Sequence, residues 1–154
     1  MTASQAVCRG FEPRPPLQIM LKIRIFSFSY KKSGIPADDT QNKGGFVFDC
    51  RFIYNPGRKT EFASLTGKDK EVIDFLDNQK EMQNFLQNSF SIVKSALDNF
   101  LSRDFTDIMV SFGCTGGQHR SVYAAEKLKI FLQDTFNGRL QIQLTHKEFP
   151  QLSS

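Results

Sequence analysis

The stretch that decides the fold is DIMVSFGC, residues Asp107–Cys114, followed at once by TGGQHRS, residues 115–121. The first eight residues are largely apolar, as in a central strand of a parallel sheet that is buried on both faces. A glycine-containing loop follows, and an amphipathic pattern over 121–136 then predicts a helix that ends at Asn137-Gly138. Strand, loop and helix in this order are typical of an α/β fold.

The rest of the chain extends the same architecture on both sides of this stretch. Alternating apolar residues predict strands over 18–30 and 140–145, and the aromatic run FVFDCRFIY predicts another over 46–54. Apolar residues that recur every three to four positions predict helices over 70–78 and 81–101. The predicted fold is a single α/β domain. It has a mixed, mostly parallel sheet flanked by helices, with a phosphate-type loop between the buried central strand and a helix.

Length and composition set the boundaries of this domain. A chain of 154 residues suits one domain with one core. Residues 1–17 are polar and rich in proline, so we expect a disordered tail or a linker there. Residues 31–45 are rich in turn formers and predict a loop. We therefore expect the domain to cover residues 18–149 and a short tail to cover 150–154.

Charge and cysteine content narrow the classes of function. The 20 Lys and Arg against 16 Asp and Glu give a net charge of +4, which favours anionic ligands without indicating nucleic acid by itself. The three cysteines are far apart, and with the two histidines they show no zinc-ligand spacing. We therefore expect no disulfide framework, no metal and no cofactor. No apolar run approaches the length of a membrane span, so we expect no membrane partner and a cytoplasmic location.

The loop after the buried strand carries the chemistry. Ligands of open parallel sheets bind beyond the carboxyl ends of the strands, and a helix start offers free N–H groups and a partial positive charge to an anion. Glycines allow the backbone to approach that anion, and an arginine adds a forked donor suited to phosphate. We therefore predict a phosphate site in the Cys114–Ser121 loop. Its candidate ligand residues are Thr115, Gly116, Gly117, Gln118, His119, Arg120 and Ser121.

The same residues allow a second hypothesis. Cys114-x-x-Gly117-x-x-Arg120-Ser121 matches the phosphate loop of cysteine-dependent phosphatases, in which a thiolate attacks phosphorus while the arginine holds the oxygens. Those enzymes usually place a histidine where this chain has Gly113, and no aspartate is marked by its context as the general acid. The structural alternative for Cys114 is a small residue buried at the end of the strand. Loss of activity in Cys114→Ser would favour the phosphatase.

Four ordered motifs resemble a known family. The run GCTGGQHRSVYAAEKL is similar to a hallmark of the C-terminal domain of the RNase adapter protein RapZ. FSFSYK with the GIP that follows it, FDCRF with Asn55-Pro56, and TGKD at residues 66–69 resemble further segments of that family in the same order. The resemblance covers about residues 23–146.

The resemblance implies a metabolite sensor rather than a catalyst. The family domain binds glucosamine-6-phosphate, and in the full adapter it also binds a small regulatory RNA and drives oligomerisation. By motif position, the residues implied to hold the sugar phosphate are Thr115, Gly116, Gly117, His119 and Arg120. The resemblance also implies that Ser27, Lys31 and Arg51 form the wall of the pocket. Asp49 and Arg51 are two charges inside an aromatic run, so we expect them to line the pocket or to pair with each other.

Three departures from the family pattern shape the expectations. No G-x-x-x-x-G-K-(S/T) occurs, so ATP binding is not expected. Gly57 follows Asn55-Pro56 where the family has histidine, which leaves the identity of the sugar open. The chain ends with little charge where the family has a basic tail that contacts RNA, and this weakens the expectation of an RNA partner. Arg58-Lys59 and His146 are predicted to be solvated surface.

The sequence as a whole predicts a non-enzymatic regulatory domain. It would bind a small phosphorylated metabolite at the Cys114–Ser121 loop and act through a second copy of itself or through a protein partner. Two alternatives from other classes stay open. One is the cysteine-dependent phosphatase that uses Cys114 and Arg120, and the other is an RNA-binding adapter module, whose affinity would fall steeply with added salt.

Overall fold

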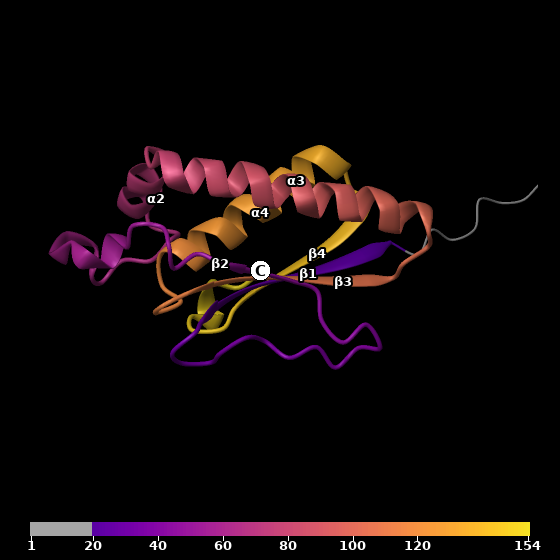
Figure 1. Cartoon of the computed structure of the whole chain (residues 1–154), viewed down its shortest axis with the longest axis horizontal. Coiled ribbons are helices and arrows are strands. Elements are labelled where there is room, and N and C mark those ends of the chain that lie inside the picture. Colours follow the sequence, from indigo (N-terminus) through magenta and orange to yellow (C-terminus); the bar gives the residue numbers. More distant parts are fainter. Residues whose placement is uncertain (1–19) are drawn as a thin grey trace, which may run out of the picture.

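A four-stranded parallel sheet lies at the centre of the computed structural model, which describes residues 20–154 (Figure 1). The strands are β1 (Leu21–Ser29), β2 (Phe46–Asp49), β3 (Asp107–Cys114) and β4 (Leu140–His146), in the order β2-β3-β1-β4. All three pairings are parallel, where a mixed, mostly parallel sheet was predicted. The predicted α/β class and the buried central strand over 107–114 are confirmed.

Helices cover one face of the sheet. They are α2 (Lys70–Asp77), α3 (Lys80–Ser102) and α4 (Arg120–Phe136), each within one or two residues of its predicted bounds. In α3 the buried residues Met82, Leu86, Phe90, Val93 and Leu97 recur at helical spacing, which turns one stripe toward the sheet. The α4 helix ends where predicted, because Asn137 adopts the left-handed conformation that closes a helix. Within residues 20–154, no helix combines the length and apolar character that a membrane crossing requires.

The predicted strand over 46–54 was wrong in its second half. Strand β2 stops at Asp49, and residues 51–53 form a turn. The Asp49 carboxylate accepts hydrogen bonds from the main-chain N and the guanidinium of Arg51, which bends the chain back on itself. The following segment contains two short 3-10 helices, η1 (Pro56–Arg58) and η2 (Thr60–Phe62). This bend carries residues 51–58 past the end of β3.

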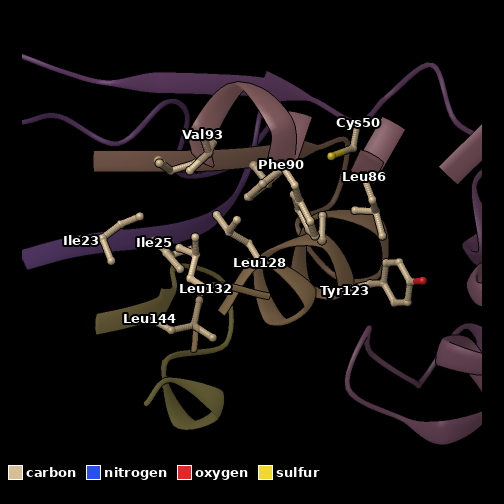
Figure 2. Close-up of a cluster of buried hydrophobic side chains, with 14 of the residues drawn as sticks. Ile23, Ile25, Cys50, Leu86, Phe90, Val93, Tyr123, Leu128, Leu132 and Leu144 are labelled. Carbon is tan, nitrogen blue, oxygen red and sulfur yellow. The ribbon is translucent and has the colours of Figure 1, made fainter. Parts of the chain in front are cut away.

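The core lies between the sheet and the helices (Figure 2). Ile23 and Ile25 from β1 and Leu144 from β4 meet residues of α3 and α4, among them Val93 and Leu128. All five side chains are buried. Burying a side chain of this size contributes about 1.5–3 kcal/mol each. This core holds the carboxyl ends of the strands in place, and the candidate site lies at those ends.

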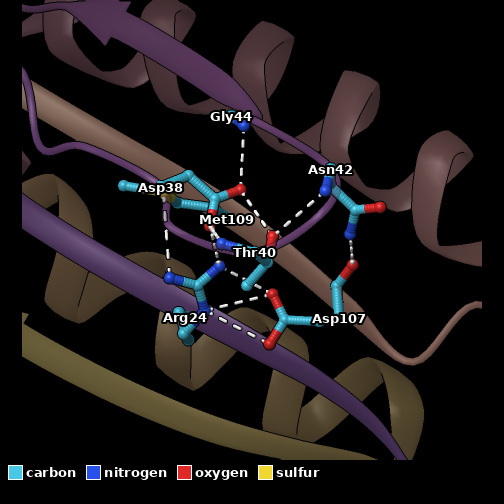
Figure 3. Close-up of polar contacts among 7 residues, drawn as sticks. All are labelled: Arg24, Asp38, Thr40, Asn42, Gly44, Asp107 and Met109. Atoms are coloured by element: carbon cyan, nitrogen blue, oxygen red, sulfur yellow. Dashed lines mark hydrogen bonds and ion pairs between the residues drawn. The ribbon is translucent and has the colours of Figure 1, made fainter.

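A long loop crosses the other face of the sheet (Figure 1). It is anchored by Arg24, whose guanidinium donates to Asp107 at 2.7 Å and to Asp38 at 2.9 Å (Figure 3). Asp38 also accepts hydrogen bonds from the main-chain N of Thr40 and of Gly44. Burial raises the pKa of Asp38, but these hydrogen bonds outweigh burial and hold the pKa well below its ordinary value. The predicted loop over 31–45 is therefore an ordered cover over the sheet.

The end of the chain folds back onto β4. Residues Pro150–Leu152 form the 3-10 helix η3, and Leu144 and Ser154 exchange two main-chain hydrogen bonds of 2.7 and 2.9 Å. Residues 150–154, expected as a tail, thus lie along the edge strand and pair with part of it. The tail or linker expected over residues 1–17 lies outside the described residues.

Candidate functional site

A pocket of about 400 Å³ opens at the carboxyl ends of β2 and β3. The segment that follows β2 forms one wall, and the loop and helix start that follow β3 form the other. This is the place where open parallel sheets bind their ligands. The pocket is rich in cationic and polar side chains and carries two exposed aromatic rings. Its lining residues are Arg51, Phe52, Ile53, Tyr54, Asn55, Arg58, Glu81, Thr115 and Arg120.

Arg120 is the most constrained cation of this pocket. Its side chain is only 3% exposed, and its Nη1 donates to the main-chain oxygens of Arg51 at 2.9 Å and Ile53 at 2.6 Å. Its Nε is buried and has no hydrogen-bond partner among residues 20–154. No carboxylate of the described chain pairs with this guanidinium either. A buried cation with a free donor is costly unless an anion compensates it, so Arg120 is a residue of this pocket that could hold an anion.

The bend after β2 positions the opposite wall. Asp49 and Arg51 form an ion pair of 2.7 Å, and the Arg51 guanidinium lies 3.8 Å over the ring of Tyr30. The Arg51 hydrogen bonds lower the pKa of Asp49. Asn55 then caps η1 by accepting a hydrogen bond from the main-chain N of Gly57 at 2.9 Å. The two predicted charges therefore pair with each other, and Arg51 also lines the pocket.

The structure divides the predicted phosphate residues into two groups. Thr115 and Arg120 line the pocket. Gln118 donates to the main-chain oxygens of Ala63 and Leu65, and the Nε2 of His119 donates to that of Phe62 at 2.8 Å. These two side chains therefore fasten the loop to the segment around η2. Burial lowers the pKa of His119 and outweighs its hydrogen bond, so the imidazole is neutral at pH 7.

The two glycines of the loop have different surroundings. Gly116 has open space around the position of a Cβ. Gly117 has a φ of +66° and lies so close to β1 that a Cβ would come within 2.9 Å of the Ser29 main-chain N. Gly67 of the TGKD motif is similarly tight, since its Cβ would lie 2.3 Å from the main-chain O of His119. The glycines of both motifs thus allow the loop to pack closely against its neighbours.

Ser27 and Lys31, predicted as pocket walls, do not line this pocket. Lys31 is exposed. Ser27 is buried, with its Oγ 2.6 Å from the Nδ1 of His146, and the Nε2 of His146 lies 3.0 Å from the Glu126 carboxylate. The surface position predicted for His146 was wrong, because its side chain is fully buried. We call Ser27, His146 and Glu126 the buried triad after its two buried members, since Glu126 is only partly buried.

Cys114 and Ser121 lie on the core side of the loop. The Cys114 side chain is 2% exposed and belongs to the hydrophobic core. Its Sγ is 3.1 Å from the Oγ of Ser121, and neither residue lines the pocket. Among residues 20–154, no three His, Cys, Asp or Glu side chains gather where they could hold a metal ion.

Several lining residues were missed from the sequence. Arg58 was predicted with Lys59 as solvated surface, yet it lines the pocket, whereas the Lys59 ammonium lies 4.7 Å over the ring of Phe75. Asn55 and Glu81 were not predicted as site residues either. The Asn55-Pro56 dipeptide was a usable signal for Asn55 and Arg58, since it starts the turn that brings both residues to the pocket. No sequence signal marked Glu81, because it lies in the first turn of α3, away from the motifs that predicted the site.

Comparisons with known proteins place this region within a described family. A family model described as RapZ C-terminal domain matches residues 21–150, which include every residue of the pocket. A nucleotide-binding protein of Pseudothermotoga lettingae is 38% identical over 77% of this chain and 40% of its own length. One of Ralstonia nicotianae is 34% identical over 95% of this chain and 45% of its own length. The chain therefore spans less than half the length of these relatives.

Proposed function

Because the chain belongs to the RapZ C-terminal domain family, as its four motifs predicted, we propose that it is a regulatory domain that binds a sugar phosphate in the pocket beside Arg120. The observation that carries the proposal is the buried guanidinium of Arg120, whose Nε has no partner in the described chain. A phosphate oxygen is a strong acceptor for the guanidinium of Arg120, which lines the pocket, and a charge-assisted hydrogen bond of this kind contributes about 1.5–3 kcal/mol.

The other lining groups suit the rest of such a ligand. The Thr115 hydroxyl comes from the same loop as Arg120 and offers a further donor to the phosphate. Asn55 and Glu81 offer an amide and a carboxylate to the hydroxyl or ammonium groups of a sugar. Glucosamine-6-phosphate, the ligand that the family resemblance implies, carries all of these groups. The candidate residues Gly116, Gly117, Gln118, His119 and Ser121 would shape the loop rather than contact the phosphate through side chains.

The proposed role is binding without catalysis. A cysteine-dependent phosphatase needs its thiolate at the centre of the phosphate loop. Cys114 instead packs in the core beside Ser121, and this supports the sensor over the phosphatase. The domain would act in the cytoplasm through a second copy of itself or through a protein partner, with RNA as a weaker alternative. The relatives are named nucleotide-binding proteins, so a nucleotide is the natural competing ligand for the test.

The test is a titration of the protein, followed through the backbone amides of residues 113–121. Glucosamine-6-phosphate, inorganic phosphate and ATP are compared, each with the wild type, Arg120→Lys and the surface control Arg103→Ala. We expect saturable shifts that are strongest with the sugar phosphate and that weaken about tenfold in Arg120→Lys, which keeps the charge but loses the fork. Arg103→Ala should bind like the wild type. Shifts with ATP alone would favour a nucleotide site, and no shifts with any ligand would refute the proposal.

A further inference from the structure

The three arginines of the pocket differ in what compensates their charge. Arg51 is paired with Asp49, so its charge is balanced within the protein. Arg120 donates hydrogen bonds from Nη1 to main-chain oxygens, which carry no net charge and so do not balance its positive charge. The guanidinium of Arg58 has neither an ion pair nor a hydrogen bond among residues 20–154, although it lines the same pocket. Two of the three cations therefore face the pocket without a paired carboxylate.

Arg58 is held in place by its backbone rather than by its side chain. It is the last residue of η1, a turn that begins at Pro56 and is capped by the Asn55 carboxamide. Proline fixes one backbone angle of this turn, and the cap adds about 1 kcal/mol of stability. The exposed Arg58 side chain is thus free to move while its attachment point stays at the rim of the pocket. Arg120 comes from a different element, the start of α4.

We infer that Arg58 and Arg120 bind one phosphate group together, so that the pocket selects the dianion of a phosphomonoester over singly charged anions. This inference rests on the proposed function, since it concerns the same phosphate. The dianion is the form that a phosphomonoester adopts near neutral pH, whereas a sulfate ester or an internal phosphodiester carries a single negative charge. Two unpaired cations balance both charges of a phosphomonoester dianion. With a singly charged ester, one positive charge of the two cations would remain unbalanced.

Glu81 limits how much negative charge the pocket accepts. Of the nine lining residues, Glu81 alone has a carboxylate side chain, and this carboxylate forms no ion pair within residues 20–154. A second phosphate group on the ligand would lie in the same 400 Å³ space as this carboxylate and be repelled by it. The charges of the lining residues thus match a ligand with one terminal phosphate and a cationic remainder.

The experiment compares two ligands that differ in the charge of a single group. Glucosamine-6-phosphate and glucosamine-6-sulfate are titrated calorimetrically at pH 7.5 and low salt. Wild type, Arg58→Ala and Lys59→Ala are measured, where Lys59→Ala removes the same charge one residue away from the pocket. We expect the wild type to prefer the phosphate ester by about tenfold or more. Arg58→Ala should lose about tenfold in affinity for the phosphate ester, and much less for the sulfate ester. Lys59→Ala should change neither affinity by more than about twofold.

The outcomes separate this inference from the proposed function. If Arg58→Ala behaves like Lys59→Ala while Arg120→Lys still weakens binding, the phosphate site stands and the shared role of Arg58 is refuted. A wild type that binds both esters equally well refutes the selection of the dianion. If the wild type binds neither ester, the proposed function itself fails. Arg58 is exposed, so its loss is not expected to unfold the domain, and circular dichroism of the variant checks this.

Discussion

Two groups of buried polar side chains lie at the same carboxyl edge of the sheet and differ in how they are satisfied. In the buried triad, both ring nitrogens of His146 have a partner, Ser27 at one side and Glu126 at the other. In the pocket, Arg120 is equally buried, yet its Nε has no partner in the described chain. A buried polar group that the protein itself completes stabilises the fold, and one that it leaves incomplete is suited to bind a ligand.

The triad resembles a catalytic arrangement only in its residue types. The Ser27 hydroxyl shares a hydrogen bond with Nδ1 of His146, and Nε2 of His146 donates to the Glu126 carboxylate, which also pairs with Lys68 at 3.4 Å. Burial raises the pKa of Glu126, but the hydrogen bond from His146 and the charge of Lys68 outweigh it and lower the pKa. Ser27 is fully buried and lines no part of the pocket, so it cannot reach a substrate there. The triad joins β1, β4 and α4.

The largest expected effect comes from breaking the triad at its centre. His146→Ala removes a buried ring and leaves Ser27 and Glu126 without their partner, so we expect the free energy of unfolding to fall by about 3 kcal/mol. Urea denaturation measures this change. Lys147→Ala, at the exposed neighbouring position, is the control and should stay within about 0.5 kcal/mol of the wild type. Equal losses in both variants would mean that the triad contributes nothing specific.

Removing one end of the triad should cost less. Ser27→Ala takes away the hydrogen-bond partner of Nδ1 of His146, and we expect a loss of about 1.5 kcal/mol in the free energy of unfolding. Because the two residues share one hydrogen bond, the loss in the double variant Ser27→Ala/His146→Ala should be smaller than the sum of the single losses, by at least about 0.5 kcal/mol. Strict additivity in this double-mutant cycle would contradict the coupling that the geometry indicates.

The pocket should respond to a ligand where the triad does not. At a free concentration of ten times its Kd, glucosamine-6-phosphate should raise the free energy of unfolding of the wild type by about 1.4 kcal/mol. The same increment is expected in Ser27→Ala, since the triad and the pocket share no residue. Thermal or urea denaturation with and without ligand measures both values. A clearly smaller increment in the variant would show that the two regions are coupled.

The smallest expected effect is a pH dependence at His119, which links the loop to η2. Burial holds its pKa below the ordinary value, so the unfolded chain takes up a proton before the folded one does. Its contribution to stability is therefore constant above about pH 6.5 and is lost as the pH falls from there toward the folded pKa. His119→Gln, which cannot be protonated, should show less of this decline in denaturation midpoints between pH 7 and pH 5. An identical pH profile in both proteins would rule His119 out as the source.

Regular periodicity was enough to predict most of the fold. The apolar run Asp107–Cys114, the stripe of α3 and the Asn137-Gly138 stop of α4 were all predicted, because local burial and backbone conformation decide them. The bend after Asp49 was missed, since the aromatic alternation runs on through Tyr54 while one ion pair between Asp49 and Arg51 turns the chain. Hydrophobic periodicity indicates which face of a strand or helix is buried. It does not indicate where a single side-chain contact ends the strand although the pattern continues.

The sequence by itself determined the α/β class, the family and the loop around Arg120, because each depends on residues that are neighbours in the chain. Only the tertiary structure decided which of these side chains line the pocket and which have their hydrogen-bonding groups satisfied by other residues of the protein. Arg58, Glu81 and Arg120 come from three separate elements, and Ser27 and His146 are 119 residues apart. Whether a buried donor finds an acceptor depends on such long-range packing, so the sequence could name the candidate phosphate donors but not which of them the fold leaves free.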